Sequence, residues 1–210
     1  AFVPKIIEQQ KFQYTSPSSK RIKTEFFPDI SNNSQTTAML AYKLSDEGNC
    51  LVFCSRPDWA VSVGKQFLDL FELYEKANLE VTSSFKKDEN LESLYMATRW
   101  FATDSTVVKC LERRIGIHYG NMPESVRKSI ETDFKNEELK ILISTNTIGQ
   151  GVNFPIKNII IHSLLRNPKT KNYVDINDFW NIVGRAGRAS QETEGQIIFP
   201  RMSRVHRQST

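Results

Sequence analysis

The sequence has few cysteines, and their spacing matches no disulfide or metal framework. Only Cys50, Cys54 and Cys110 are present, and no two of them form a C-x-x-C pair. An odd number without such a pair argues against both a disulfide framework and a zinc site, so we predict no metal site. Cys50 and Cys54 bracket an apolar run and are expected to be small core residues. This cysteine usage favours a reducing compartment, and we expect the cytoplasm.

Long hydrophobic runs and a phosphate-binding loop are also missing. No apolar run approaches the ~20 residues that span a bilayer, so we expect no membrane partner. A P-loop requires G-x-x-x-x-G-K-[ST], but the only Gly-Lys pair, Gly64-Lys65, is followed by Gln66 inside a helical pattern. We therefore expect that this chain does not hold a nucleoside triphosphate by itself.

Length and composition are those of a globular protein. The chain has 210 residues, of which 39% are hydrophobic and 25% are charged. A chain of this length buries roughly 70% of its unfolded surface, so it needs no disulfide or metal for support. The length fits one large domain, or one domain with an appendage. The net charge of +4 permits nucleic-acid binding but does not establish it.

Short apolar runs and helical patterns alternate along the chain. The apolar runs predict buried strands, and apolar residues at helical spacing predict helices. Their alternation predicts an α/β fold with a mostly parallel sheet. Residues 1–33 are rich in turn signals and are expected to form an extended lead-in, or a hairpin. The predicted strands are 50–54, 115–118, 140–145, 158–162 and 195–199, and the predicted helices are 34–44, a long one from Pro57, 91–101, 107–113, 123–134 and 178–187.

The stretch with the most chemistry is 181–188, which reads Asn-Ile-Val-Gly-Arg-Ala-Gly-Arg. On a helix, Arg185 and Arg188 share one face, so both guanidinium groups would point the same way and suit a chain of phosphates. Gly184 and Gly187 weaken a helix by roughly 1 kcal/mol each, and the close approach of a backbone or ligand is the favoured reason for them. The alternative is a surface helix with two solvated arginines.

Three further stretches begin where a predicted strand ends, which is where open α/β sheets bind ligands. In 144–155, short polar side chains and glycines offer donors to a phosphate or sugar, although a polar strand-to-helix turn explains them equally well. Ser55 and Arg56 suit a nucleic-acid phosphate, or else form a helix cap with a solvated arginine. In 117–123, His118 alone reads as a core histidine, while the helix start nearby suits an anion.

In their order along the chain, these four stretches resemble the motifs of the second RecA-like domain of superfamily 2 helicases of the DExH type. Gly-Val-Asn-Phe-Pro at 151–155 and Gly-Arg-Ala-Gly-Arg at 184–188 are most similar to the superkiller-like branch. That branch usually has Gln where this chain has Asn181, and His-His where it has His118-Tyr119. Residues 51–56 look like motif IV, 117–127 like the histidine-glycine segment IVa, 143–155 like motif V and 181–188 like motif VI.

The resemblance implies a RecA-like three-layer domain over residues 34–210, with 1–33 linking it to an upstream motor domain. It implies ATP and Mg²⁺ as cofactors, held mainly by a first RecA-like domain that has no counterpart here, so this chain alone would be inactive. The implied partners are that domain of the same protein and single-stranded DNA or RNA. It implies Arg185 and Arg188 as arginine fingers, Gly151, Asn153, Asn181 and Gly184 beside the nucleotide, and Ser55, Arg56, Gly120, Asn121, Thr145, Asn146 and Thr147 along the nucleic-acid strand.

Two other functions fit the same residues. A double-strand DNA translocase of a restriction or defence complex, which never unwinds, would share all four motifs. A strand-separating hairpin would distinguish the two, and in this superfamily it often follows motif V. Residues 163–177 read either as such a hairpin or as a plain loop. The other candidate is a non-catalytic RecA-like scaffold that binds nucleic acid, and the presence of both Arg185 and Arg188 argues against it.

Overall fold

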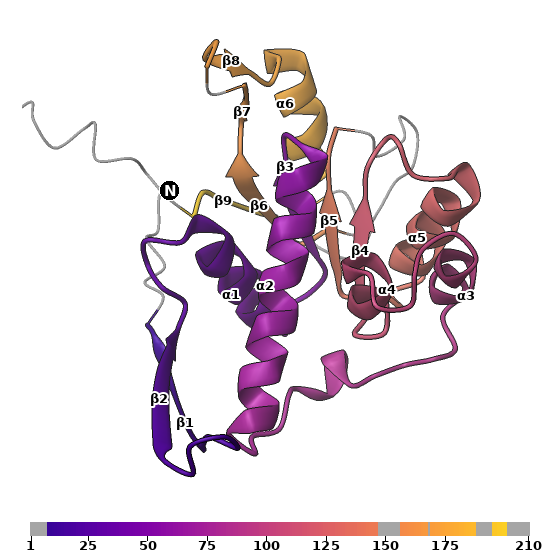
Figure 1. The fold of residues 1–210 in the computed structure, drawn as a ribbon. Helices are drawn as coiled ribbons and strands as arrows, with labels where there is room; N and C mark the ends of the chain where they lie inside the picture. Colours follow the sequence, from indigo (N-terminus) through magenta and orange to yellow (C-terminus); the bar gives the residue numbers. More distant parts are fainter. Residues whose placement is uncertain (1–7, 147–155, 168, 188–194, 201–210) are drawn as a thin grey trace, which may run out of the picture.

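A sheet of five parallel strands forms the centre of the molecule (Figure 1). The computed structural model describes residues 8–146, 156–167, 169–187 and 195–200. The strand order is β4-β5-β3-β6-β9, and every residue of β3, β4 and β5 is buried, as expected for strands covered on both faces. The five strands are β3 (Cys50–Cys54), β4 (Ile115–His118), β5 (Ile141–Ser144), β6 (Asn158–Ser163) and β9 (Gln196–Ile198).

Six α-helices lie in the described part of the chain, and short polar side chains begin three of them. Asn32, Ser105 and Asp175 each accept a hydrogen bond from a backbone N–H in the first turn of the helix that follows. All predicted strands and helices are found, although the helices predicted over 91–101, 107–113 and 178–187 end early, at Thr98, Leu111 and Val183. The helices are α1 (Asn33–Leu44), α2 (Pro57–Lys76), α3 (Glu92–Thr98), α4 (Thr106–Leu111), α5 (Glu124–Lys135) and α6 (Ile176–Val183), with a 3-10 turn at Ser83–Phe85.

Helices cover both faces of the sheet. Consecutive residues of a strand point to opposite faces of the sheet. The neighbours of Gly116 and of Ile117 in β4 therefore show which helix covers each face. A Cβ atom on Gly64 of α2 would lie 2.5 Å from Ile117 Cδ1, so α2 packs on the face of Ile117. A Cβ atom on Gly116 would lie 3.0 Å from a side-chain carbon of Ile130 in α5, so α5 covers the other face. The predicted three-layer α/β domain with a mostly parallel sheet is therefore confirmed.

An antiparallel hairpin, β1 (Gln10–Thr15) with β2 (Ile22–Phe27), precedes the sheet and packs on α2 (Figure 1). The Phe12 side chain is fully buried, and its ring lies edge-on to that of Tyr74 at 5.2 Å. The hairpin considered for residues 1–33 is therefore present, and it occupies residues 10–27. The division of the chain at residue 34 stays a prediction.

Cys50, Cys54 and Cys110 are all buried, as expected for core residues. Burial raises the pKa of the Cys54 and Cys110 thiols far above the ordinary value. These thiols are therefore packing residues rather than nucleophiles. Among the helices that the structure describes, none is long and apolar enough to span a membrane.

His162, next to the end of β6, is held without charge in the layer of α1. Thr37 Oγ1 lies 2.8 Å from His162 Nδ1, and the side-chain amide of Asn33 donates to the His162 carbonyl at 3.0 Å. The indole of Trp59 stands edge-on to the imidazole at 6.2 Å. Burial lowers the pKa of His162 from 6.5 to about 4. Acid should therefore destabilise the fold through this residue.

We predict that the free energy of unfolding falls as the pH drops from 6.5 to 4, with about 3 kcal/mol of the loss due to His162. The unfolded chain takes up a proton near pH 6.5, whereas the folded chain does so only near pH 4, so the stabilisation is complete above 6.5. Urea unfolding at a series of pH values measures the effect. The His162→Gln variant should lose that part of the pH dependence, and an unchanged dependence would contradict the assignment.

Candidate nucleotide and nucleic-acid site

Helix α6 ends at Val183, so the predicted helix over 178–187 is wrong at its C-terminal end. Gly184 is the C-cap residue, and Arg185 follows the helix rather than lying on it. The chain continues as a turn, in which the Arg185 and Ala186 N–H groups donate to the Ile182 and Val183 carbonyls. Gly187 then changes the direction of the chain with a φ of 71°, which glycine adopts readily. The expectation that Arg185 and Arg188 project from one helical face therefore fails at Arg185.

The segment after α6 is tied to the chain just before β6, an interior strand of the sheet. Ala186 forms a parallel bridge with Ile156, and the Gly187 N–H donates to the Ile156 carbonyl at 3.1 Å. A Cβ atom on Gly195 would lie 2.5 Å from the backbone nitrogen of Gly187 and 2.7 Å from the carbonyl carbon of Ala186. Gly195, just before β9, allows this close backbone approach, and the reason expected for Gly184 and Gly187 stays a prediction.

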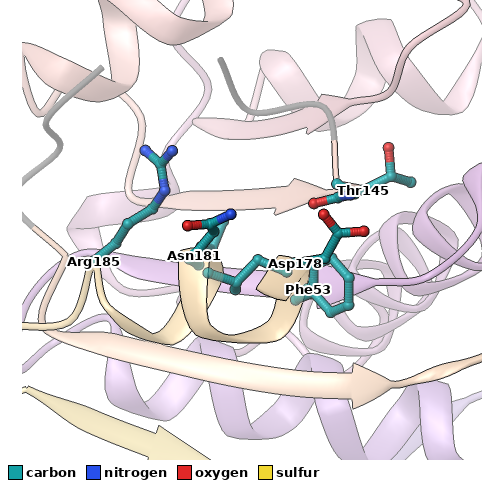
Figure 2. Close-up of a pocket in the computed structure, with 8 residues that line it drawn as sticks. Phe53, Thr145, Asp178, Asn181 and Arg185 are labelled. Carbon is teal, nitrogen blue, oxygen red and sulfur yellow. The ribbon is translucent and has the colours of Figure 1, made fainter. Parts of the chain in front are cut away.

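A pocket opens between α6 and the central strands β3 and β5, with Thr145 at the carboxyl end of β5 and Arg185 toward the other end of the pocket (Figure 2). Asn181 and Asp178 come from α6, Thr145 follows β5, and the Arg185 side chain rises beside Asn181 in Figure 2. The complete lining is Leu51, Phe53, Thr145, Asn146, Asp178, Asn181, Ile182 and Arg185. Around an apolar floor lie two amides, a hydroxyl, a guanidinium group and the Asp178 carboxylate, which suits a polar ligand.

Asp178 is a lining residue that sequence reasoning missed. Its carboxylate accepts a hydrogen bond from Arg166 in β7 (Leu165–Asn167) at 2.8 Å, and both side chains are partly exposed. Helical spacing could have identified it, because Asp178 lies three residues before Asn181 and therefore shares its face of the helix. The ion pair joins α6 to the chain that precedes it and balances one positive charge near the pocket.

Thr145 is held by its backbone to the neighbouring strand β4. Its N–H donates to the His118 carbonyl at 3.1 Å, and His118 Nε2 lies 2.9 Å from a carboxylate oxygen of Glu131 in α5. The His118 side chain is fully buried, and this burial lowers its pKa although Glu131 opposes the effect. His118 is thus the core histidine expected from the sequence. Gly120 and Asn121 lie in an exposed turn two residues further on.

Ser55 and Arg56 lie at the end of β3 and start α2. The Ser55 hydroxyl donates to the Leu165 carbonyl at 2.8 Å, so it fastens β7 to the sheet. Arg56 makes two hydrogen bonds to Asp58, at 2.9 and 2.7 Å, and its guanidinium lies 5.3 Å from the centre of the Trp59 ring. Arg56 and Asp58 are both exposed, and such surface pairs are worth at most about 1 kcal/mol, so a phosphate can compete with the carboxylate.

The structure brings only part of the predicted site together. Thr145, Asn146, Asn181 and Arg185 line one pocket, and Gly184 lies between the last two as the helix cap. The lining of this pocket does not include Ser55, Arg56, Gly120 or Asn121, which lie at the ends of β3 and β4. Thr147, Gly151, Asn153 and Arg188 lie outside the described residues.

Comparisons with known proteins found a family and individual proteins that are similar to this chain. The family described as "Helicase conserved C-terminal domain" matches residues 81–190. Hachiman protein HamB of Bacillus cereus is 31% identical over 196 residues, which are 93% of this chain and 16% of that protein. The ATP-dependent DNA helicase Hel308 of Methanococcus vannielii is 28% identical over 171 residues, which are 80% of this chain and 22% of that protein. A solved structure of S. cerevisiae Dbp5 bound to Gle1 and IP6 covers 80% of this chain and 33% of its own, with 15% identity and a TM-score of 0.49.

Proposed function

Since the chain belongs to the helicase conserved C-terminal domain family of superfamily 2, we propose that it is the C-terminal motor domain of an ATP-dependent nucleic-acid helicase. The chain spans only 16% and 22% of the length of the first two relatives, so the activity is that of a longer parent protein. The observation that supports the proposal most directly is the pocket that gathers Asn181 and Arg185 of motif VI with Thr145 and Asn146 of motif V.

In this proposal Arg185 and Arg188 reach the terminal phosphate of ATP. ATP with Mg²⁺ supplies the transferable phosphoryl group, and the first RecA-like domain of the parent holds most of it, since this chain has no P-loop lysine. The guanidinium group of Arg185 neutralises charge that develops during transfer. Asn181, Gly184, Gly151 and Asn153 lie beside the nucleotide.

The nucleic-acid track runs along the carboxyl ends of the strands. The backbone of a single strand, DNA or RNA, contacts short side chains and exposed turns there, and such contacts read phosphate and sugar rather than base edges. When the two RecA-like domains of the parent open and close against each other, the contacts of this domain with the nucleic acid move along the strand. The residues proposed for the track are Ser55, Arg56, Gly120, Asn121, Thr145, Asn146 and Thr147.

The test is ATP turnover by the parent protein and by this chain alone. We expect the parent to hydrolyse ATP, with a rate that rises when single-stranded DNA or RNA is added, and the polymer that stimulates more strongly is the natural track. We expect this chain alone to show no turnover above the background of the assay, because it has no loop that cradles the phosphates. A parent that binds nucleic acid but never hydrolyses ATP would favour the scaffold instead.

A second candidate is a double-strand DNA translocase of a defence complex. The similarity to Hachiman protein HamB over 93% of the chain fits this alternative. Both functions use the same pocket and the same arginines, so turnover alone does not separate them. The two candidates differ in whether the parent separates the strands of a duplex.

A further inference from the structure

Strand β2 has one long edge that no other strand of the described residues covers. Within the described residues β2 pairs only with β1, so its other side presents a row of backbone donors and acceptors. Five of its six residues are exposed, with Phe27 the exception. Ile22 is 75% exposed and Phe26 is 55% exposed, which is unusual for large apolar side chains on an edge strand. We use the name β2 edge for the unpaired side of residues 22–27.

The hairpin behind this edge is firmly held. Phe12 of β1 is buried against Tyr74 of α2, and the Tyr74 hydroxyl donates to the Gln10 side chain at 3.0 Å. The Tyr14 hydroxyl donates to the Glu25 carboxylate, which joins β1 to β2. The β2 edge is therefore a preformed strand, so a partner strand meets little cost of ordering it.

The sequence of β2 is complementary to itself when it is reversed. With Thr24 opposite Thr24 in an antiparallel pair, Lys23 lies opposite Glu25, and Ile22 lies opposite Phe26. Two-residue alternation places the Lys–Glu pairs on one face and the apolar pairs on the other. Opposite-charge and apolar pairs across an antiparallel ladder each stabilise it by about 0.2–1 kcal/mol.

We propose that the β2 edge binds the β2 edge of a second copy of this chain, forming a four-stranded antiparallel sheet across a two-fold axis at Thr24. A two-fold interface must be self-complementary, and the order Ile22-Lys23-Thr24-Glu25-Phe26 meets that requirement in both charge and apolar character. Six residues a side make a small interface, so we expect a weak dimer with a micromolar dissociation constant. The inference does not depend on the proposed function.

Charge reversal tests the pairing. In the dimer, position 23 of each copy lies opposite position 25 of the other copy. Two carboxylates would therefore face each other at both of these places in Lys23→Glu, and two ammonium groups would face each other there in Glu25→Lys. Each variant alone should dimerise roughly tenfold more weakly or worse, as measured by sedimentation equilibrium over about 1 μM to 1 mM. An equimolar mixture of the two variants has opposite charges facing again and should associate as tightly as the original chain. A fault in folding would not be repaired by mixing.

Two controls keep the result specific. Lys11→Glu makes the same change of charge on β1 and should leave the dimer unchanged, because Lys11 is exposed on the strand that does not meet the partner. Circular dichroism of each variant reports on the fold. A chain that stays monomeric up to about 1 mM, or variants whose mixture associates no better than either alone, would overturn the proposal.

A cross-link identifies the occupant of the edge. On the two-fold axis the Cα atoms of the two Thr24 residues would lie about 4.5–5.5 Å apart, within the range that a disulfide bridges. Oxidised Thr24→Cys should therefore run as a covalent dimer, whereas Gln13→Cys on β1 should not. The native cysteines are buried and do not compete. In the parent protein, a cross-link from Thr24→Cys to another segment of the same chain would assign the edge to that segment and overturn the proposal.

Discussion

Arg185→Ala in the parent protein should lower kcat for ATP hydrolysis by about 10³-fold or more, with much smaller changes in KM and in nucleic-acid affinity. The arginine acts on charge that develops during phosphoryl transfer, so its loss affects the transition state more than the bound substrate. Arg185 lies in the turn after α6 and lines the pocket, so the substitution leaves the helix and its cap in place. Single-stranded nucleic acid at saturation gives the largest signal for the assay.

Two variants make this result specific. Arg185→Lys keeps the charge but loses the forked pair of donors, so we expect only partial recovery of kcat. Arg99→Ala removes an exposed arginine at the end of α3, outside the pocket lining, and should leave kcat unchanged. Full turnover by Arg185→Ala would mean that the segment after α6 has a structural role and no catalytic one. The non-catalytic scaffold would then become the leading function.

The strands were predictable because each is a short apolar run bounded by polar residues. Residues 50–54 and 115–118 match β3 and β4 in full. A strand that is buried on both faces is a nearly continuous apolar run, so its first and last residues can be read from the sequence. The layer order also follows from the alternation of strands and helices. Local pattern and global fold agree at these positions, so sequence reasoning succeeds there.

The end of α6 was not predictable from the same rules. The arginines at positions 185 and 188 suggested a helical face, whereas the helix ends at Val183 and Ala186 pairs with Ile156, just before β6. The partner of this segment lies thirty residues earlier in the sequence, and no local signal reports it. Gly184 keeps a φ of −67°, so the left-handed conformation with which glycine usually ends a helix appears only at Gly187.

Long-range contacts at the site were not predictable from the sequence either. The Ser55 hydroxyl donates to the Leu165 carbonyl, which is 110 residues away in the sequence, and the place of Ser55 on the nucleic-acid track stays a prediction. Asp178 joins the pocket because the chain returns over the strand ends between β6 and α6. Sequence spacing identifies residues of a suitable type, but the tertiary fold decides which of them meet.

The hairpin of β7 and β8 (Asn172–Tyr173) resolves one alternative left open by the sequence, because residues 163–177 hold a hairpin and not a plain loop (Figure 1). Two hydrogen bonds hold its base. Ser55 donates to the Leu165 carbonyl, and the Val174 N–H donates to the Leu164 carbonyl at 2.8 Å. Tyr173 is 59% exposed, and Lys171 is exposed beside it. An exposed aromatic ring with cations nearby suits an unpaired base and its phosphate.

If the parent unwinds duplexes, Tyr173→Ala combined with Lys171→Ala should slow strand separation by about tenfold or more, because stacking of one base is worth about 1–3 kcal/mol. ATP hydrolysis stimulated by single strands should change by less than about twofold, since neither residue lines the pocket. Fluorescent strand-displacement and ATPase assays on the same preparation measure both. Tyr95→Ala is the matched control, because Tyr95 is 58% exposed and lies on α3, away from the hairpin (Figure 1).

The same pair of variants separates the two candidate functions. A double-strand translocase would displace a third strand from a triplex while leaving the duplex intact, and the hairpin substitutions would not change that rate. A helicase would lose strand separation in the hairpin variant and keep it in Tyr95→Ala. Equal unwinding by both variants would mean that the hairpin does not separate strands, because Tyr173 and Tyr95 differ in location but hardly in exposure.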